Sequence, residues 1–145
     1  MSKETDAAYA AALVDGEGSI VVHSFIRKGR GLQFSTRIVV VNTDVPLLVW
    51  LRETFGGNIV RKKRIRLTSK QCWEWQVYAE VADKFADIIR PYLKIKREQL
   101  EIFCMMRGRQ KARAAKRPRK RLLEWEVKER TEWVDRMHIL NRKGA

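Results

Sequence analysis

The sequence predicts an α+β domain in which helices cover one face of a four-stranded antiparallel sheet. Three observations support this: helical and extended patterns alternate along the first 106 residues, short polar turns join the extended stretches in pairs, and 45% of the 145 residues are apolar. This length suits one compact domain with an appendage. We expect a core domain over residues 1–106 and an extension over residues 107–145, comprising a basic linker and a C-terminal helix.

The first element is expected to be a short alanine-rich helix over residues 6–15, with Asp6 as its N-cap and glycines at its end. Two strands follow at residues 19–27 and 32–41. The loop 28–31, which holds two glycines, should join them as a β-hairpin.

The next helix is expected over residues 44–55, because Asp44 can cap it, a proline stands early and two glycines end it. A second pair of strands should span residues 58–67 and 71–78, joined by a turn at 68–70.

The third helix should run from Val81 to Ile89 and stop before Pro91, and a fourth should cover about residues 96–106. The apolar stripe of the third helix consists of Val81, Phe85, Ile88 and Ile89.

Alternation within the strands predicts one apolar and one polar sheet face. In the second strand Phe34, Ile38 and Val40 point one way, and in the fourth strand Trp73, Trp75 and Val77 do so. In the third strand Arg61 and Lys63 share a face with Ile59 and Ile65. The polar face could lie in a DNA major groove and read base edges, or could simply face water as many antiparallel sheets do.

The charge points to a polyanionic partner. The chain has 31 Lys and Arg against 17 Asp and Glu, a formal net charge of +14. Nucleic acid is the commonest such partner, although ribosomal and membrane-surface proteins share this composition. Cys72 and Cys104 lack the spacing of a zinc site or a disulfide scaffold. No signal peptide or membrane span is evident, so we expect a soluble intracellular protein, cytoplasmic in location.

The segment Ala10–Gly18, AAALVDGEG, carries the most specific information. The small residues Ala8, Ala11 and Ala12 would let two identical helices pack closely about a two-fold axis. The helix end then presents two acids where the helix dipole disfavours them, and a hard divalent cation would reverse that penalty. The alternative is a glycine-rich turn whose acids merely cap backbone amides.

This segment resembles the signature of the LAGLIDADG homing-endonuclease family. It differs in having alanine instead of the first leucine and Glu17 instead of the last aspartate. Residues 40–44 (VVNTD) and 91–99 (PYLKIKREQ) resemble two further stretches of that family, so the similarity covers residues 6 to about 106.

The resemblance implies an αββαββα fold in which the sheet forms a saddle on double-stranded DNA. It further implies a homodimer that cuts both strands of a long, roughly palindromic site with Mg²⁺ or another divalent cation such as Mn²⁺, and a host intron or intein. Glu17 and Gly16 would bind the metal, and Asp15 would join Glu17 in catalysis. Asn42 would organise water near the cut phosphate, and Lys96 would stabilise developing negative charge.

By the same resemblance, the bare sheet face would bind DNA. Its candidate residues are His23, Arg27, Gln33, Ser35, Arg37, Arg61, Lys63, Glu74 and Gln76. Phe25 falls on the same face, where an aromatic side chain is atypical of a polar DNA-binding surface. Phe25 could contact a thymine methyl, or the register of this strand could be shifted by one residue. The alternative function is an RNA maturase of this fold, with intron RNA as a partner, or a DNA-binding protein that does not cleave.

The tail beyond residue 106 is strongly basic, with 14 basic and 5 acidic residues. It could bind phosphates flanking the site, or could be a solvated linker interrupted by Pro118. A helix is expected over residues 122–140, with Trp125, Trp133, Met137 and Leu140 on the face that docks.

Overall fold

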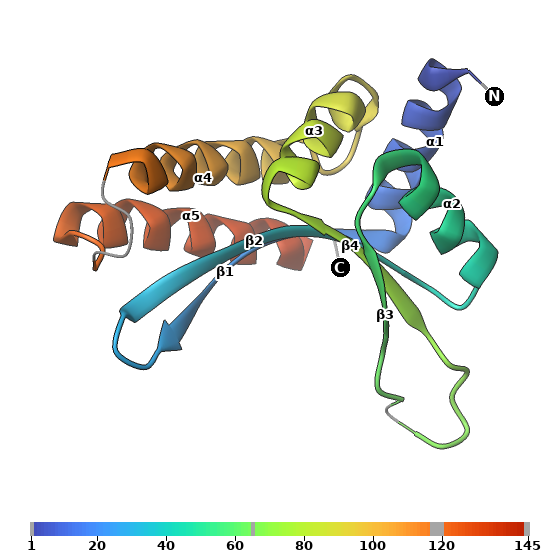
Figure 1. Ribbon diagram of the computed structural model, residues 1–145, viewed down its shortest axis with the longest axis horizontal. Coiled ribbons are helices and arrows are strands. Elements are labelled where there is room, and N and C mark those ends of the chain that lie inside the picture. Colours follow the sequence, from blue (N-terminus) through green and yellow to red (C-terminus); the bar gives the residue numbers. More distant parts are fainter. Residues whose placement is uncertain (1, 65, 117–120, 144–145) are drawn as a thin grey trace. The chain divides into compact units, whose positions relative to one another are not determined.

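The computed structural model describes residues 2–64, 66–116 and 121–143 (Figure 1). The α+β expectation is confirmed: the four strands form an antiparallel sheet in the order β1-β2-β4-β3. The chain divides into two compact units. Unit 1 comprises residues 1–20 and 37–97, and unit 2 comprises residues 21–36 and 98–145.

The elements are, in chain order, α1 Lys3–Glu17, β1 Gly18–Arg27, β2 Gly31–Asn42, α2 Val45–Phe55, β3 Asn58–Arg61, β4 Trp73–Tyr78, α3 Ala79–Ile89, the 3-10 helix η1 Arg90–Tyr92, α4 Arg97–Lys116 and α5 Glu124–Lys143. The αββαββα order is therefore present, and two helices follow it.

Helix α1 is longer than expected at both ends. Its N-cap is Ser2, whose side chain accepts a hydrogen bond from the Thr5 backbone N–H, and so the prediction of Asp6 as N-cap was wrong. The helix continues through Gly16 to Glu17, although glycine is an unfavourable residue in a helix. By contrast, the Asp44 cap of α2 is confirmed: its carboxylate accepts from the Leu47 N–H at 3.1 Å.

Unit 1 is built around a buried apolar layer between α1, α2, α3 and the strands β2 and β4 (Figure 1). Trp75 is fully buried and its indole N–H donates to the Gly56 carbonyl at 2.8 Å. Trp75 packs edge-to-face against Phe85 of α3, with ring centroids 5.0 Å apart, and Phe85 packs in the same way against Phe55 of α2, with ring centroids 5.1 Å apart. This cluster fixes α2 and α3 on the sheet.

The buried stripe of α3 differs from the predicted one. Ala82, Phe85, Ala86 and Ile89 are buried, whereas Val81 and Ile88 are 39% and 41% exposed. Small alanines allow the helix to approach the sheet closely, and the larger residues on either side are displaced outward. Hydrophobic periodicity alone cannot identify the buried alanines of α3, because a search for apolar residues at helical spacing favours the bulkier side chains.

The second hairpin is shorter in regular structure than expected. β3 ends at Arg61 rather than at Leu67, which is 90% exposed. A turn closed by the Ser69 N–H and the Arg66 carbonyl replaces the predicted turn at 68–70. Ile65 lies outside the described residues.

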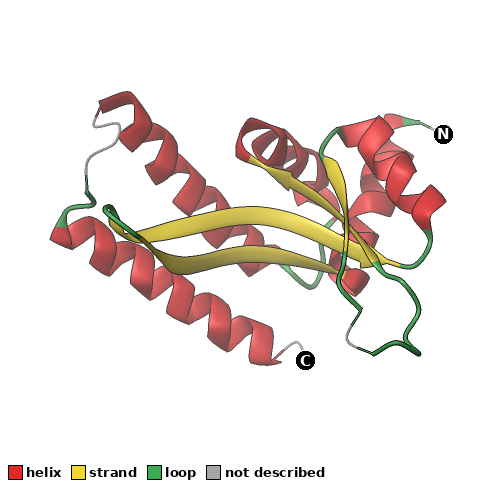
Figure 2. Cartoon of the chain, turned by 60° about the horizontal axis from the view of Figure 1, so that its bottom comes forward, coloured by secondary structure: helices red, strands yellow, loops and turns green. Residues whose placement is uncertain are grey.

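Unit 2 holds the outer part of the first hairpin, β1 from Val21 and β2 up to Thr36, together with α4 and α5 (Figure 2). The hairpin prediction is confirmed, and Gly29 in its turn has a positive φ of 82°. The side-chain amide of Gln110 on α4 accepts from the Thr36 hydroxyl at 2.9 Å and donates to the Phe34 carbonyl at 3.2 Å.

Helix α4 extends to Lys116, ten residues beyond the expected end, so the part of the expected linker at 107–116 is helical. It runs antiparallel to α5 (Figures 1 and 2). Ion pairs join the two helices: Glu98 of α4 lies 2.8 Å from Arg136 of α5, and Arg109 of α4 lies 2.7 Å from Glu129 of α5. Pro118 lies outside the described residues.

The docked face of α5 overlaps the predicted one only in part. Its buried residues are Glu126, Arg130, Val134 and Met137, whereas Trp125 is 56% exposed and Trp133 is half-buried. Of the predicted residues, Met137 is buried and Leu140, like Trp133, is half-buried, so only Trp125 departs clearly from the prediction. Two of the four buried positions are charged, and a search for apolar residues at helical spacing could not identify them.

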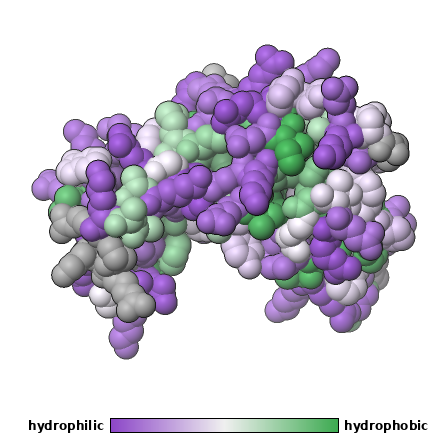
Figure 3. All heavy atoms as spheres, turned by 45° about the horizontal axis from the view of Figure 1, so that its top comes forward, coloured by the Kyte–Doolittle hydropathy of each residue, from purple (hydrophilic) through white to green (hydrophobic). Residues whose placement is uncertain are grey.

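The face drawn in Figure 3 is mostly hydrophilic, with smaller hydrophobic areas among the hydrophilic ones. Among the described residues, no helix combines the length and the hydropathy needed to cross a bilayer.

Candidate active site and polar sheet face

The C-terminal end of α1 is tied to the segment that enters α4. Asp15 accepts three backbone N–H groups, from Lys94 at 2.8 Å, Ile95 at 3.2 Å and Lys96 at 3.0 Å. Both carboxylate oxygens are engaged. These donors offset the unfavourable position of an anion at a helix C-terminus, and Asp15 therefore has the geometry of a backbone cap.

The side chain of Lys96 returns to the same helix end. Its Nζ donates to the Val14 carbonyl at 2.9 Å and to the Gly18 carbonyl at 2.5 Å. Burial lowers the pKa of this ammonium, and the nearby Asp15 carboxylate opposes the decrease. An ammonium has three donors, so one remains for a further acceptor once the two carbonyls are bound.

Glu17 is the last residue of α1 and its side chain is exposed. The Nδ2 atom of Asn42, at the end of β2, donates to Glu17 Oε2 at 2.7 Å. Asn42 Oδ1 in turn accepts from the Asp44 N–H at 2.9 Å. The amide is thus held from both sides and fixes the orientation of the Glu17 carboxylate.

Four predicted site residues therefore meet at the C-terminal end of α1, within unit 1: Asp15, Glu17, Asn42 and Lys96. Gly18 permits the approach: a Cβ there would lie 2.7 Å from the Val14 Cα and 2.9 Å from the Val39 carbonyl oxygen. Such distances are shorter than real Cβ contacts, and only glycine fits between the helix end and β2.

The donor set at this point suits a hard divalent cation in part. Glu17 offers an exposed carboxylate and Gly16 an exposed backbone position. Among the described residues, no group of three or more His, Cys, Asp or Glu side chains could hold a metal. Mg²⁺ usually keeps several waters and binds through one or two carboxylates and substrate phosphates, and a single carboxylate is compatible with that habit.

The polar face of unit 1 is an organised network rather than a set of free side chains. Glu74 on β4 is only 6% exposed and lies 3.5 Å from Lys62 Nζ and 3.9 Å from Arg37 Nη1. Arg37 also donates to the Gln76 side chain at 3.2 Å. The predicted residues Arg37, Glu74 and Gln76 thus share one face and hold each other in place.

The strand register corrects the prediction for the second hairpin. Arg61 is paired with Trp73 and Val60 with Glu74, so Arg61 lies on the face of Trp73 and not on the polar face. Lys63 lies beyond the end of β3. Lys62, which was not among the predicted residues, reaches the polar network instead through Glu74, because the pairing of β3 with β4 decides which residues share its face.

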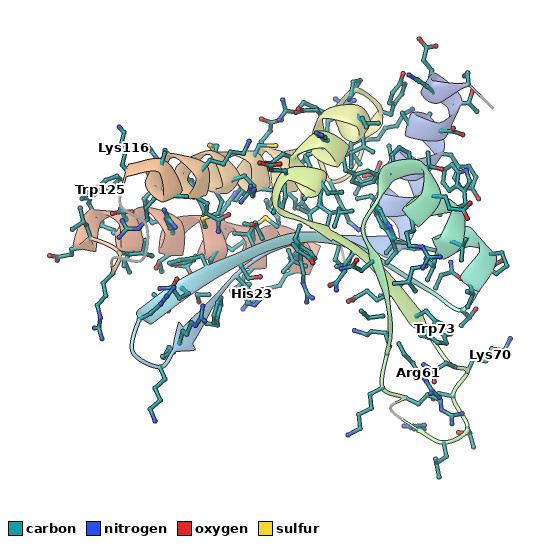
Figure 4. All side chains as sticks on the ribbon, viewed as in Figure 1. His23, Arg61, Lys70, Trp73, Lys116 and Trp125 are labelled. Atoms are coloured by element: carbon teal, nitrogen blue, oxygen red, sulfur yellow. The ribbon has the colours of Figure 1, made fainter. Side chains whose placement is uncertain are left out.

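Basic side chains gather beyond the end of β3, in the loop of the second hairpin. Arg61 donates to the Gln71 side chain at 3.0 Å, and Gln71 donates to the carbonyls of Lys62 and Cys72, both at 2.7 Å. Figure 4 shows Arg61, Lys70 and Trp73 in this region. An open pocket of about 320 Å³ is lined by Gln71 and by the four consecutive cations 61–64.

In unit 2, the remaining candidates lie on the first hairpin. His23, labelled in Figure 4, and Phe25 are neighbours on one face of β1, with ring centroids 6.3 Å apart. In β1, Ile20 and Val22 are buried, whereas Val21 and His23 are half-buried and Phe25 is exposed. His23 and Phe25 therefore lie on the less buried face of the strand. Arg27 is exposed and Ser35 half-buried, while Gln33 donates to the carbonyls of Arg30 and Leu32.

Several solved structures with this arrangement are homing endonucleases. The homing endonuclease I-CvuI, in complex with the I-CreI target, has a TM-score of 0.75 at 19% identity over 95% of this chain and 83% of its own. The archaeal intron-encoded I-Vdi141I, complexed with DNA, has a TM-score of 0.77 at 14% identity over 96% of this chain and 86% of its own. The LAGLIDADG meganuclease I-AabMI, bound to uncleaved DNA, has a TM-score of 0.69 at 19% identity over 88% of this chain and 45% of its own.

This chain has the LAGLIDADG fold. A comparison with family sequence profiles finds no match, and a comparison with curated protein sequences finds none either. The segment that resembles the LAGLIDADG motif, residues 10–18, forms the end of α1 and the first residue of β1, and α1 is called the LAGLIDADG helix below.

The exposed side of the LAGLIDADG helix differs from the one expected. Ala8 and Ala12 are exposed and, four residues apart, lie on the same helix face. Ala11 is fully buried in the core of unit 1 and has no surface for a second helix, which corrects its assignment. Tyr9 is 48% exposed beside them and packs edge-on against Trp50 with ring centroids 5.4 Å apart.

Proposed function

We propose that this protein is a homing endonuclease that makes a double-strand break in a specific DNA site by hydrolysing one phosphodiester in each strand. The observation that carries the proposal is the grouping of Glu17, Asn42 and Lys96 at one end of α1. A carboxylate held by an amide, with an ammonium beside the same helix end, suits attack on a phosphate.

Divalent metal, Mg²⁺ or Mn²⁺, would be held by Glu17 and the Gly16 carbonyl, and when bound it supplies Lewis-acid activation of the phosphate and of water. Asn42 is the positioning residue in this proposal, because it orients Glu17 directly. Lys96 is the residue that we expect to face developing negative charge with its remaining donor. Asp15 acts through Lys96, by holding its backbone.

Double-stranded DNA is the proposed substrate because of charge and surface chemistry. The net charge of +14 attracts a polyanion. On β2 and β4, Arg37 and Gln76 present the donors and acceptors that read base edges. On the first hairpin, His23, Phe25 and Arg27 supply further contacts, and the cations at the open end of the second hairpin suit phosphates.

A homodimer is proposed because one protomer supplies one such carboxylate site, while a double-strand break requires two. The exposed Ala8 and Ala12 would allow the α1 helices of two copies to approach closely. Two-fold symmetry then predicts a roughly palindromic target.

The deciding experiment is digestion of a randomised double-stranded DNA library with the purified protein and Mg²⁺, followed by sequencing of the cut ends. We expect a single recurrent site. Glu17→Gln should abolish cutting while leaving binding of the selected site in Ca²⁺ unchanged within about threefold. Glu53→Gln, which removes an exposed acid from α2, is the matched control and should cut normally. Normal cutting by Glu17→Gln would exclude Glu17 as the metal ligand.

The dimer is tested separately by sedimentation of the protein bound to its selected site. Ala12→Gln places a longer side chain on the exposed face of α1 and should reduce the dimeric fraction. Ala115→Gln, on the exposed side of α4, should not. A stable monomer on DNA that still cuts both strands would overturn this part of the proposal.

A further inference from the structure

A cluster of buried charges joins α4 to α5 in unit 2. Arg113 donates to Glu126, and Arg130 Nη2 lies 3.5 Å from Glu126 Oε2. The side chains of Arg113, Glu126 and Arg130 are only 12%, 7% and 5% exposed. Arg113 also donates to the carbonyl of Arg121, at the entry to α5. Desolvation makes such a cluster costly, so packing of two helices alone does not explain it.

The cluster forms the floor of a pocket of about 190 Å³. Four of its lining residues are basic, one is acidic and three are apolar or aromatic. They are Arg109, Arg113, Lys116, Arg130, Glu126, Ala112, Leu123 and Trp125. The volume is below the range of about 300–1,000 Å³ typical of whole small-molecule ligands, and suits one unit of a longer chain.

Basic residues outnumber acidic ones at the floor of the pocket. Two buried guanidinium groups share the Glu126 carboxylate. Burial lowers the pKa of Arg130, and the charges of Arg113 and Arg109 lower it further while Glu126 and Glu129 oppose the decrease. Lys116 adds an exposed cation at the rim. An anionic group entering the pocket would relieve this repulsion.

The rim of the pocket also carries a large exposed ring. Trp125 is 56% exposed, and the Arg109 guanidinium lies 5.8 Å from its ring centroid (Figure 4). The ion pair of Arg109 with Glu129 at 2.7 Å helps to fix that guanidinium, so the indole has a supported position. An exposed aromatic ring beside cations is the arrangement with which proteins stack an unpaired base and bind its phosphate.

We propose that this pocket binds one unpaired nucleotide of a single-stranded nucleic acid, with the base on Trp125 and the phosphate on Lys116 and the arginines. Bases in a duplex stack on each other and offer no free face to the indole, so the duplex interacts here through phosphates alone. The proposal concerns binding only and does not depend on the cleavage proposed above.

The test is fluorescence anisotropy of short labelled oligonucleotides with the full-length protein, in the absence of divalent metal. The probes are oligothymidylate, oligouridylate, an abasic strand with the same number of phosphates, and a duplex of equal length. Base stacking contributes roughly 1–3 kcal/mol per base, so Trp125→Leu should weaken binding of oligothymidylate about 5- to 150-fold. Trp125→Phe should restore most of the affinity. Equal binding of the two pyrimidine strands indicates the shared chemistry, and a preference identifies DNA or RNA as the natural ligand.

Matched variants separate the pocket from general charge. Lys116→Gln should weaken binding, whereas Lys128→Gln, on the exposed side of α5 and outside the pocket, should weaken it less. Tight binding of the abasic strand by the wild type, or an unchanged affinity in Trp125→Leu, would overturn the proposal and leave a polyanion surface. The abasic comparison requires no substitution, so it decides the question even if a variant fails to fold. A cleavage-inactive protein that still prefers thymidylate to the abasic strand would support this inference and contradict only the proposed nuclease activity.

Discussion

Removing the Asp15 carboxylate tests whether this acid is a backbone cap or a catalytic group. The substitutions are Asp15→Ala, which removes the acceptor, and Asp15→Asn, which keeps one oxygen. In the native protein the carboxylate accepts from the N–H groups of Lys94, Ile95 and Lys96. We expect both variants to lose stability, and Asp15→Asn to lose less.

The magnitude follows from how many of these donors water can reach. The bonds to Lys94 and Ile95 are solvent-exposed, so water replaces the lost acceptor at low cost, whereas the bond to Lys96 is partly buried. Loss of a hydrogen bond to a charged group costs about 1.5–3 kcal/mol, and loss of a helix cap about 0.5–2 kcal/mol. We therefore expect Asp15→Ala to lower the free energy of unfolding by about 2 kcal/mol, and Asp15→Asn by about 1 kcal/mol.

The measurement is urea unfolding followed by circular dichroism and by tryptophan fluorescence, with linear extrapolation to water. Because the chain forms two compact units, coincident transitions from the two probes are needed before a single free energy is derived. Glu17→Gln is the control: this side chain is exposed and has one hydrogen bond to Asn42, so its loss should change stability little.

The two acids should behave in opposite ways. Asp15→Asn should lose stability and retain most DNA cleavage, whereas Glu17→Gln should retain stability and lose cleavage. If Asp15→Asn were as stable as the wild type, the cap would contribute nothing. If it were stable and inactive, Asp15 would belong with the groups that contact the reacting phosphate.

Three further predictions follow from the same structure. Gly18→Ala should lower the free energy of unfolding by at least about 1–3 kcal/mol, because its Cβ would lie 2.7 Å from the Val14 Cα; Gly16→Ala, with nothing within 4 Å, should be neutral or stabilising in the same urea experiment. Glu126→Gln should lower the free energy of unfolding by about 3–5 kcal/mol, because it removes the carboxylate that two buried arginines share. Although burial raises the pKa of Glu126, hydrogen bonds from Arg113 and Leu123 and the charges of Arg113 and Arg130 hold it below its usual value. The ionised Glu126 carboxylate therefore stabilises the protein above the usual carboxyl pKa, and this stabilisation is lost as pH falls through the lowered pKa of Glu126. Glu126→Gln should accordingly lose less stability than the wild type on acidification, and identical stability profiles in acid would contradict this. Because burial lowers the pKa of Lys96, the stability of the wild type relative to Lys96→Met should increase as pH rises from that lowered pKa towards about 10.4, and a difference independent of pH would contradict it.

The order of helices and strands up to α4 was predictable because each element has a local cause. Alternating apolar residues mark β2 and β4, and Asp44 caps α2 as its position indicated. Glycines at 29 and 56 take positive φ values that few other residues adopt, so the turns were evident as well. The sequence also placed Glu17, Asn42 and Lys96 in one site, through a resemblance and not through spacing.

The errors arose where a long-range contact decides the outcome. Whether Arg61 or Lys62 joins the polar face depends on the pairing of β3 with β4, and a shift of one residue exchanges the faces. Ala8 and Ala11 are both small, and only packing against the rest of unit 1 buries one and exposes the other.

By itself, then, the sequence determined the αββαββα order, the basic character of the protein and the acids at the end of α1, since these depend on composition and local periodicity. Only the tertiary structure decided that Asp15 holds backbone while Asn42 holds Glu17, and that charged residues of α5 face inward while Trp125 faces out. The physical reason is that hydrogen-bond partners and burial are set by residues tens of positions apart, which no local pattern specifies.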